Sequence, residues 1–275
     1  DVEFQNTGTS FLSGNNTFHD VSFSGNATIS GNNTFNDLTL ASSRSYTISN
    51  TATVLGTFTA NGTCGTPMSL QGGTISKPSG SVTINHVRLT GLAAVGGASF
   101  TANNVTDFGG NTGWTLNTPT PQTLYWVGGN GNWTDANRWS NNPGGTGGTC
   151  IPTIYDNVVF DTQSGFGPSV TINAQAYCKD MTWTGGLSSP SIAGTFPLDI
   201  YGSLTLTPGM SITYTGAIGF KSFAASLRTI TTAGNQLRSA LTFDGAGAQW
   251  VLQDPLVTFN NGTVLTLSQG SLNTN

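Results

Sequence analysis

The sequence repeats itself at short range near its start. Residues 13–23, SGNNTFHDVSF, return seventeen residues later as residues 30–40, SGNNTFNDLTL, and a half copy, SGNATI, lies between them at residues 24–29. Self-similarity at a short fixed period is typical of chains that stack on themselves coil by coil. The repeat therefore favours a rigid, extended surface over the compact pocket of an enzyme.

The spacing of turns predicts how such a coil is built. Short runs of alternating apolar and polar residues end at Gly, Asn or Ser, and almost no stretch has helical periodicity. Near the start a turn recurs about every six residues, so three short faces would make a coil of about 17–20 residues. We predict an all-β protein of β-solenoid or β-helix-like modules with short strands, in which stacked Asn and Thr side chains form ladders. β-Sandwich modules are the alternative, because strands recurring every 8–12 residues would also fit the second half.

One pair of acidic residues conflicts with a uniform coil. A strict seventeen-residue period would place Asp20 directly beneath Asp37, and like charges about 5 Å apart repel each other. Either the two carboxylates share a cation or the coil length varies. We favour variation.

The composition limits the functions that are open to the chain. Charged residues make up 7% of the 275 residues, the net charge is −4, and the eight Lys and Arg are scattered, which argues against nucleic-acid binding. The apolar runs are too short to span a bilayer, although a hydrophobic content of 36% is enough for a packed core. Abundant Thr and Asn with little Lys suit an extracellular, cell-surface protein. The start of the chain has no signal-peptide pattern, so we expect a mature or excised piece.

A break in the pattern divides the chain. The segment 117–123, NTPTPQT, has two prolines among polar residues and is typical of a linker. We predict one β-rich module in residues 1–118, a linker at 119–123 and a second β-rich module in residues 124–275.

Several motifs in order resemble a known family. They are WVGGNGNWTDANRWS at 126–140, DNVVFD at 156–161, CKDMTW at 178–183, GSLNTN at 270–275 and GGNTGW at 109–114. Together they resemble the repeated module of giant cell-surface adhesins of Bacteroidota, the SprB-like gliding-motility adhesins. The match is permuted: the first part looks like the C-terminal part of one module and the second like the N-terminal part of the next.

The resemblance implies a role and a setting. Such adhesins are exported by type IX secretion and are carried along the cell surface. The chain would then be a structural repeat segment of a large secreted adhesin or filament, acting in surface adhesion and gliding motility. Its partners would be neighbouring repeats of the same chain, surface polysaccharide or another glycan, and the secretion and motility machinery of the outer membrane.

Three tryptophans could hold a sugar or close a core. Trp126, Trp133 and Trp139 stand six or seven residues apart in a Gly- and Asn-rich segment, with Arg138 beside them. Exposed aromatic rings next to amides are a common platform for sugars, and Arg138 could lie across one ring. The start of a module also needs a plug for its apolar core, and we favour the plug. A carbohydrate-binding module is the alternative function.

Four aspartates near the start of the second module are candidate calcium ligands. Asp135, Asp156, Asp161 and Asp180 could bind calcium together with Asn and backbone carbonyl oxygens. No calcium-binding repeat is present. Asp side chains also cap turns, and we favour that role and expect no cofactor.

The three cysteines leave an odd thiol. Cys150 and Cys178 lie close enough in sequence to close a loop worth roughly 3–4 kcal/mol if they are bridged, and an oxidising compartment would permit this. The bridge and isolated small apolar side chains are equally open. The odd number leaves one thiol unpaired or paired outside this segment, so the partner of Cys64 stays open.

Catalysis is disfavoured by the residues available. The chain has two histidines and a single glutamate, and His19 is replaced by Asn36 in the second copy of the repeat. No nucleophile and base arrangement is indicated. We predict that the chain is not an enzyme, and a glycan-degrading β-helix enzyme is the weakest of the three functions considered.

Overall fold

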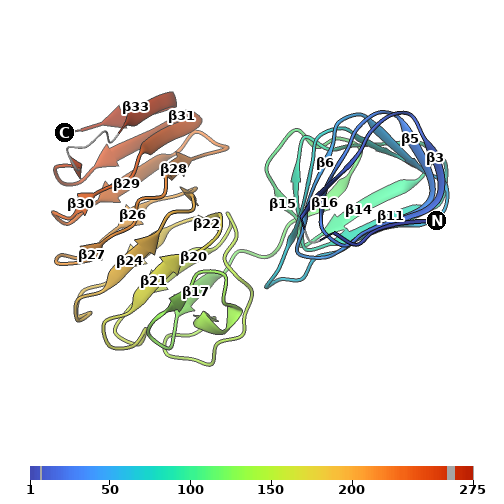
Figure 1. Ribbon diagram of the computed structural model, residues 1–275. Coiled ribbons are helices and arrows are strands. Elements are labelled where there is room, and N and C mark those ends of the chain that lie inside the picture. The colour runs from blue at the N-terminus through green and yellow to red at the C-terminus, as the bar shows by residue number, and fades with distance from the viewer. Residues whose placement is uncertain (7, 259–263, 275) are drawn as a thin grey trace. The chain divides into compact units, whose positions relative to one another are not determined.

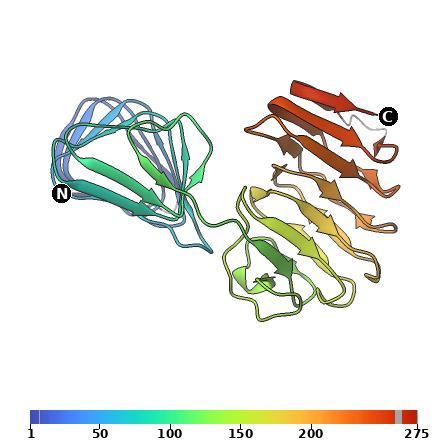
Figure 2. The same cartoon turned by 180° about the vertical axis from the view of Figure 1, so that it is seen from behind.

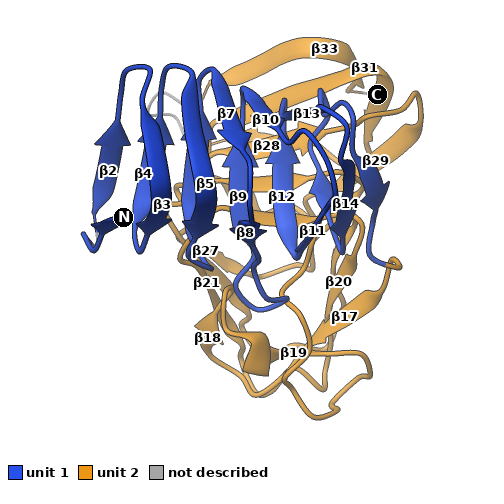
Figure 3. Cartoon of the chain, turned by 90° about the vertical axis from the view of Figure 1, so that its right-hand side faces the viewer, with its two compact units in different colours: residues 1–119 blue, residues 120–275 orange. Residues whose placement is uncertain are grey.

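The computed structural model describes residues 1–6, 8–258 and 264–274, and the chain forms two compact units, Asp1–Pro119 and Thr120–Asn275 (Figure 3). The fold is a β-solenoid of about 13 turns, with 50% of the residues in strands and 1% in helix. The prediction of a β-solenoid is confirmed. A β-sandwich does not fit, because successive coils pair in parallel and sandwich sheets are antiparallel. Within the described residues, no helix has the length and apolar character needed to cross a membrane.

Unit 1 is built from three rows of parallel strands. The first row runs in the order β1 (Val2–Phe4), β3 (Thr17–Phe23), β5 (Asn33–Leu40), β7 (Thr51–Val54), β10 (Thr74–Ser76), β13 (Ala93–Val95). A further strand, β8 (Phe58–Ala60), pairs with β5 beside this row. The second contains β2 (Thr9–Leu12), β4 (Asn26–Ile29), β6 (Ser45–Ile48), β9 (Met68–Gln71), β12 (Val87–Thr90) and β15 (Thr106–Asp107). The third contains β11 (Ser81–Asn85), β14 (Ser99–Asn103) and β16 (Thr115–Asn117).

The coils of unit 1 differ in length. Thr17 pairs with Thr34, seventeen residues on, whereas Ser45 pairs with Ser69, twenty-four residues on. The extra residues lie in the turns between strands, which leaves the stacking of the faces intact. The expected variation is therefore present along the unit.

Variation does not, however, separate the two aspartates. Asp20 pairs with Asp37 in register within the seventeen-residue coil, so the prediction that varying coil length keeps them apart is wrong. The two carboxylates have different donors instead. Asp20 Oδ1 accepts from Asn36 Nδ2 at 3.3 Å, and Asp37 Oδ1 accepts from the backbone N–H of Thr57 at 2.5 Å.

Alternating apolar side chains fill the core of unit 1, and asparagine side chains provide hydrogen bonds at its corners. In β5 and β6 the inward side chains Phe35, Leu38 and Tyr46 are fully buried. At the corner, Asn33 Oδ1 accepts from the side-chain amide of Asn16 at 2.9 Å. The Asn33 amide group itself donates to the Ser30 carbonyl at 2.9 Å. The predicted Asn ladder therefore exists, and it supplies hydrogen-bond partners that the turns would otherwise lack.

Unit 2 stacks its strands in the same way (Figures 1 and 2). The main row runs in the order β19 (Trp139–Ser140), β17 (Thr123–Trp126), β20 (Asn157–Phe160), β23 (Met181–Trp183), β26 (Leu204–Thr205), β29 (Leu227–Thr231), β31 (Leu241–Leu252), β28 (Ile218–Lys221), β25 (Leu198–Ile200), β22 (Ala176–Cys178). A further strand, β33 (Leu265–Asn273), pairs with β31 beside this row. The shorter rows are β18 (Gly131–Asn132), β21 (Ser169–Ile172), β24 (Ser191–Gly194), β27 (Ser211–Ile212), and β30 (Gln236–Leu237) with β32 (Val257–Thr258).

The first coil of unit 2 carries a long insertion. Thr123 pairs with Asn157, thirty-four residues on, whereas later coils such as Ala176 to Leu198 take twenty-two. The inserted residues include a single 3-10 turn, η1 (Ala136–Arg138), and the strand β19, which pairs with β17 in antiparallel orientation. This antiparallel pair occupies the edge of the first coil.

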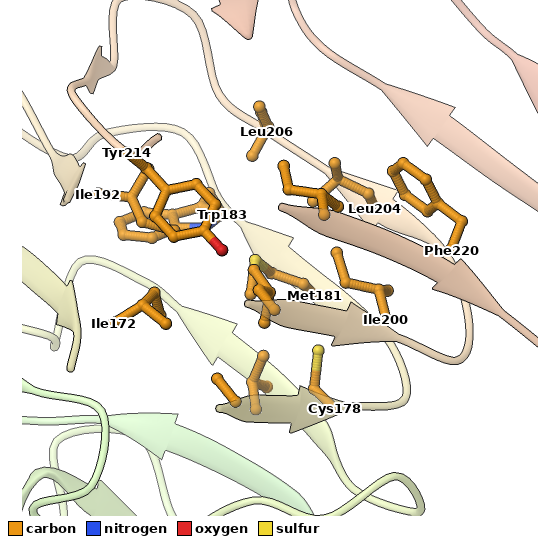
Figure 4. Close-up of a cluster of buried hydrophobic side chains, with 14 of the residues drawn as sticks. Ile172, Cys178, Met181, Trp183, Ile192, Ile200, Leu204, Leu206, Tyr214 and Phe220 are labelled. Carbon is orange, nitrogen blue, oxygen red and sulfur yellow. The ribbon is translucent and has the colours of Figure 1, made fainter. Parts of the chain in front are cut away.

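The core of unit 2 is filled by aliphatic and aromatic side chains from successive coils. Figure 4 shows Met181, Ile200 and Leu204 directed toward one another, with Trp183 and Tyr214 beside them. An apolar cavity of only about 20 Å³ remains among these side chains, which is too small for a ligand. Unit 2 therefore has a packed core with no internal binding pocket at this point.

Candidate functional site

The three tryptophans of the first coil form one buried cluster. Trp126, Trp133 and Trp139 are each at most 1% exposed. The rings of Trp126 and Trp133 meet that of Trp139 edge-on, with centroids 5.1 Å and 4.9 Å apart, and Phe160 follows at 6.0 Å from Trp139. Phe160 in turn stacks on Trp183 at 3.9 Å. The cluster closes the core at the start of the unit and leaves no ring face for a sugar.

Hydrogen bonds fix this cluster and its neighbour Arg138. The indole N–H of Trp139 donates to the Trp133 carbonyl at 2.9 Å. The Arg138 guanidinium donates to the Gly128 carbonyl at 2.5 Å and lies 3.6 Å from the Asp135 carboxylate. Arg138 thus braces the inserted loop. The alternative of a sugar platform made of these three rings and Arg138 is wrong, because the rings are needed inside the core.

The four candidate calcium ligands are used to hold turns. Asp135 accepts from the Asn137 N–H and caps η1. Asp156, which is buried, accepts from Gln122 N at 3.0 Å and from Thr153 N at 2.9 Å. The contacts with Asn137 and Thr153 are local turn caps, whereas the contact with Gln122 ties Asp156 to a segment thirty-four residues earlier.

Asp161 and Asp180 follow the same pattern, accepting from Gln163 N at 2.8 Å and from Ser203 N at 2.7 Å. In the described part of the chain, these four aspartates do not form a group whose oxygens converge as metal ligands do. Their contacts with backbone donors agree with the favoured role as turn caps, and a calcium site completed by Asn and backbone carbonyl oxygens stays a prediction.

A different group of potential ligands lies at the start of unit 1. One ligand atom each of Asp1, His19 and Asp20 come within 4.8 Å of one another. His19 Nδ1 lies 3.3 Å from Asp1 and 3.1 Å from Asp20. The Asn36 amide, with smaller contributions from His19, lowers the pKa of the Asp20 carboxyl. Because all three side chains are largely exposed, water screens the attraction between them.

The cysteines are not bridged. Cys178 is a free thiol on β22 and is fully buried, whereas Cys150 is exposed, so the Cys150–Cys178 disulfide is not formed. Side chains along β22 alternate between buried and partly exposed, and Cys178 is at a buried position. Burial, together with the negative charges of Asp180 and Asp156, raises the pKa of this thiol. Cys178 therefore acts as a small apolar core residue.

A row of charged residues on the outer face of unit 2 is not evident from the sequence. Asp199, Lys221 and Asp244 lie on the neighbouring strands β25, β28 and β31, and Lys221 Nζ is 3.0 Å from Asp244. A Cβ on Gly219 would come within 2.1 Å of the Asp199 carboxylate. Desolvation raises the pKa of Asp199, and Lys221 partly offsets this. Lys221 and Asp244 are in register, whereas Asp199 is opposite Gly219. Predicting these neighbours requires the coil length, which the sequence of unit 2 does not show.

The fold and these contacts define the class: the chain is a parallel β-solenoid with up to three strands per coil, whose conspicuous polar and aromatic residues mostly hold turns and ends. The chain matches no protein-family model, no curated protein and no solved structure. What it does must therefore be inferred from its own geometry.

Proposed function

We propose that the chain is a structural repeat segment of a large secreted surface adhesin or filament, and that it acts as a stiff, protease-resistant spacer. The observation that carries this proposal is the stacking of coils. Every strand from β20 to β31 pairs with a strand one coil away, so backbone hydrogen bonds run along the axis. Bending a unit between its coils would break several of these bonds at once.

The use of functional residue types supports this role. The tryptophans of the first coil of unit 2, most of the aspartates and the buried Asn33 contact backbone groups or each other. A spacer needs these contacts and needs no catalytic group, and we therefore propose no enzymatic activity. The low charge of the chain is compatible with a surface solvated by hydroxyl and amide groups.

The proposal includes a location and partners. The segment would lie outside the cell, next to further repeats of the same kind, and would be delivered by the outer-membrane secretion and motility machinery. The support is the family resemblance of the tryptophan-rich motif together with the rod-like stacking. A polysaccharide ligand would have to bind elsewhere than the buried tryptophans.

Limited proteolysis with a non-specific protease tests the spacer role. We expect cleavage at residues 118–122 first, giving two resistant fragments that mass spectrometry can assign. The same chain in denaturant is the control and should be cleaved throughout. Early cleavage inside several coils of the native chain would contradict a protease-resistant spacer.

Antibody labelling tests the location. An antibody against the folded chain should label intact producing cells, and brief treatment of the cells with external protease should remove the signal. A cytoplasmic protein serves as the control that the cells stay closed. Labelling that requires permeabilised cells would refute the proposed location, and it would leave the mechanical role to be judged by proteolysis.

A further inference from the structure

Two neighbouring corner loops of unit 2 are longer than the loops before and after them. The same corner, where the chain passes from the main row to the short rows, takes four residues at 127–130, eight at 161–168, seven at 184–190, five at 206–210 and four at 232–235. The stacking of coils is thus possible with four or five residues here. The second and third loops therefore carry residues that the coil itself does not require.

An open hollow lies between these two longer loops. Its volume is about 400 Å³, and small-ligand sites in proteins have volumes of roughly 300–1,000 Å³. Both loops contribute to its lining, which includes Thr162, Gln163, Gly165, Phe166, Leu187 and Ser188. We propose that this hollow binds a neutral glycan, which stacks a sugar ring on Phe166 and hydrogen-bonds its hydroxyls to Gln163 and Ser188.

The exposure of Phe166 is the first support for this site. Its side chain is 92% exposed, more than any other large apolar side chain in the described part of the chain. A single exposed apolar residue is ordinary on a protein surface. Phe166 differs because it lines a hollow together with hydroxyl and amide groups. A sugar ring has C–H groups on its faces and hydroxyls around its edge, so it matches an aromatic ring with polar neighbours.

The first loop is fixed at its base without a ligand. Ser164 is fully buried, and its hydroxyl accepts from the Asp161 N–H at 3.0 Å. The Ser164 carbonyl accepts from the N–H of Gly129, in the loop of the preceding coil, at 2.8 Å. On the other side, the Pro168 carbonyl accepts from the N–H of Ser191 in the following coil at 2.9 Å. A site held in this way loses little conformational freedom on binding.

The two loops also approach each other closely at glycines. A Cβ on Gly186 would lie 3.1 Å from Thr162 Cγ2, and both of these residues line the hollow. A Cβ on Gly167 would lie 2.8 Å from the Ser188 carbonyl. The loops are therefore packed against each other beside the hollow, which agrees with a shape that exists before the ligand binds.

The lining favours a neutral ligand that is both polar and apolar. Among the described residues that line the hollow, none has a charged side chain. An acidic sugar would therefore lose hydration without gaining an opposite charge. A lipid chain or an apolar peptide would cover the hydroxyl and amide groups without bonding to them, which is costly. A neutral sugar can use the ring and the polar groups together.

The inference rests on the proposed function only for its setting, because a cell-surface protein is where a neutral polysaccharide would be met. The two proposals fail separately. A purified chain that binds no glycan could still be the resistant spacer. Early proteolysis inside the coils would refute the spacer and would leave the binding result unaffected.

Isothermal titration calorimetry on the purified chain tests the site. The probes are neutral hexasaccharides of glucose, mannose and xylose, namely maltohexaose, cellohexaose, laminarihexaose, mannohexaose and xylohexaose. Oligogalacturonate is the acidic comparison. We expect at least one neutral probe to bind with a Kd of about 0.1–1 mM, a range typical of few contacts in an open site, and oligogalacturonate to bind more weakly.

Three substitutions locate the binding. Phe166→Ala should weaken binding of the neutral probe about tenfold, because the stacked ring is lost. Phe166→Trp should keep or strengthen binding, because it retains an aromatic face. The matched control is Phe11→Ala, which removes a 74% exposed ring from unit 1 and should leave the affinity unchanged. Circular dichroism checks that each variant is folded.

Failure of every neutral probe to bind would overturn the proposal. It would also be overturned if Phe166→Ala kept the full affinity, or if oligogalacturonate bound more tightly than the neutral probes. The apolar dye anilinonaphthalene sulfonate tests the other occupant. Dye binding that Phe166→Ala abolishes, in a chain that binds none of the hexasaccharides, would identify an apolar docking surface and refute the glycan site.

Discussion

Unit 1 and unit 2 use the same coil but hold it together differently. In unit 1 the corners are stacked directly on one another, as in the contact between Asn16 and Asn33. In unit 2 the coils are mostly longer, and large aromatic side chains such as Phe160 and Trp183 stack through the core. Rings also stack in unit 1, as in Phe18 and Phe35, so the comparison indicates that tight coils add support from the turn residues to that of the interior.

The two units also differ in how far the tryptophans that close their ends are buried. The first coil of unit 2 buries Trp126, Trp133 and Trp139 almost completely, whereas the last coil of unit 1 relies on Trp114, which is partly buried. Burial of a whole indole contributes several kcal/mol through transfer from water and close packing. Loss of the plug should therefore affect unit 2 more than unit 1.

The largest expected effect is that of removing the plug of unit 2. Trp139→Ala should lower the free energy of unfolding of unit 2 by about 3–5 kcal/mol, because it leaves a cavity among three aromatic rings. Hydrogen exchange read by mass spectrometry measures each unit separately. Trp114→Ala is the matched variant at the closed end of unit 1, and we expect it to cost less. Equal losses in the two units would remove the contrast between their ends.

A second test concerns how closely the corners of unit 1 approach each other. Gly31 has φ +83°, and an added Cβ would come within 2.0 Å of the Gly14 carbonyl. Gly31→Ala combines left-handed strain of about 1–2 kcal/mol with overpacking of about 1–3 kcal/mol. Gly91→Ala, at φ +61° with open space around it, should show the strain alone. Equal stability losses in urea unfolding would mean that corner contact does not support unit 1.

A third test separates the buried corner amide from its exposed neighbour. Asn33 is 1% exposed and bonds both to the preceding corner and to its own turn. Asn33→Ala should cost about 2 kcal/mol, because buried backbone and side-chain groups lose their partners. Asn32→Ala, whose side chain is exposed, should cost less than about 0.5 kcal/mol. Thermal unfolding of both variants measures the difference, and a costly Asn32→Ala would argue against burial as the cause.

The sequence predicted most of unit 1 and less of unit 2, for a physical reason. In unit 1 equivalent turn residues of successive coils stack on one another. The coil period is therefore visible in the sequence as the repeat of Ser-Gly-Asn-Asn at residues 13 and 30. In unit 2 the apolar interior sets the stacking, and many apolar residues can fill it, so no repeat marks the coil. The alignment of Lys221 with Asp244, and of Asp199 with Gly219, was therefore hidden.

The burial of individual side chains was harder to predict than the positions of the strands. For the tryptophan-rich loop of residues 126–139 the sequence favours a plug but leaves a sugar platform open, because sequence gives residue type and not exposure. The structure decides through the insertion that folds across the first coil. Likewise, the sequence showed only that Asp20 and Asp37 would be neighbours with like charge. It did not show their separate hydrogen-bond donors, Asn36 and Thr57, which come from neighbouring coils.

The smallest expected effect is a difference in pH dependence between the units. The pKa of Asp20 in unit 1 is lowered from 3.8, so its contribution to stability is present above that value and is lost as the pH falls through the lowered pKa. The pKa of Asp199 in unit 2 is raised from 3.8. Its protonated form is favoured by folding, so that its contribution is present at low pH and is lost as the pH rises through the raised pKa. Between pH 5 and pH 3, Asp20→Asn should reduce the acid loss of unit 1, and Asp199→Asn should reduce the acid gain of unit 2. Urea unfolding of each variant across this range, followed by hydrogen exchange for each unit, measures how the free energy of unfolding changes with pH. If the two substitutions changed this pH dependence in the same direction, the two carboxylates would not differ as their surroundings indicate.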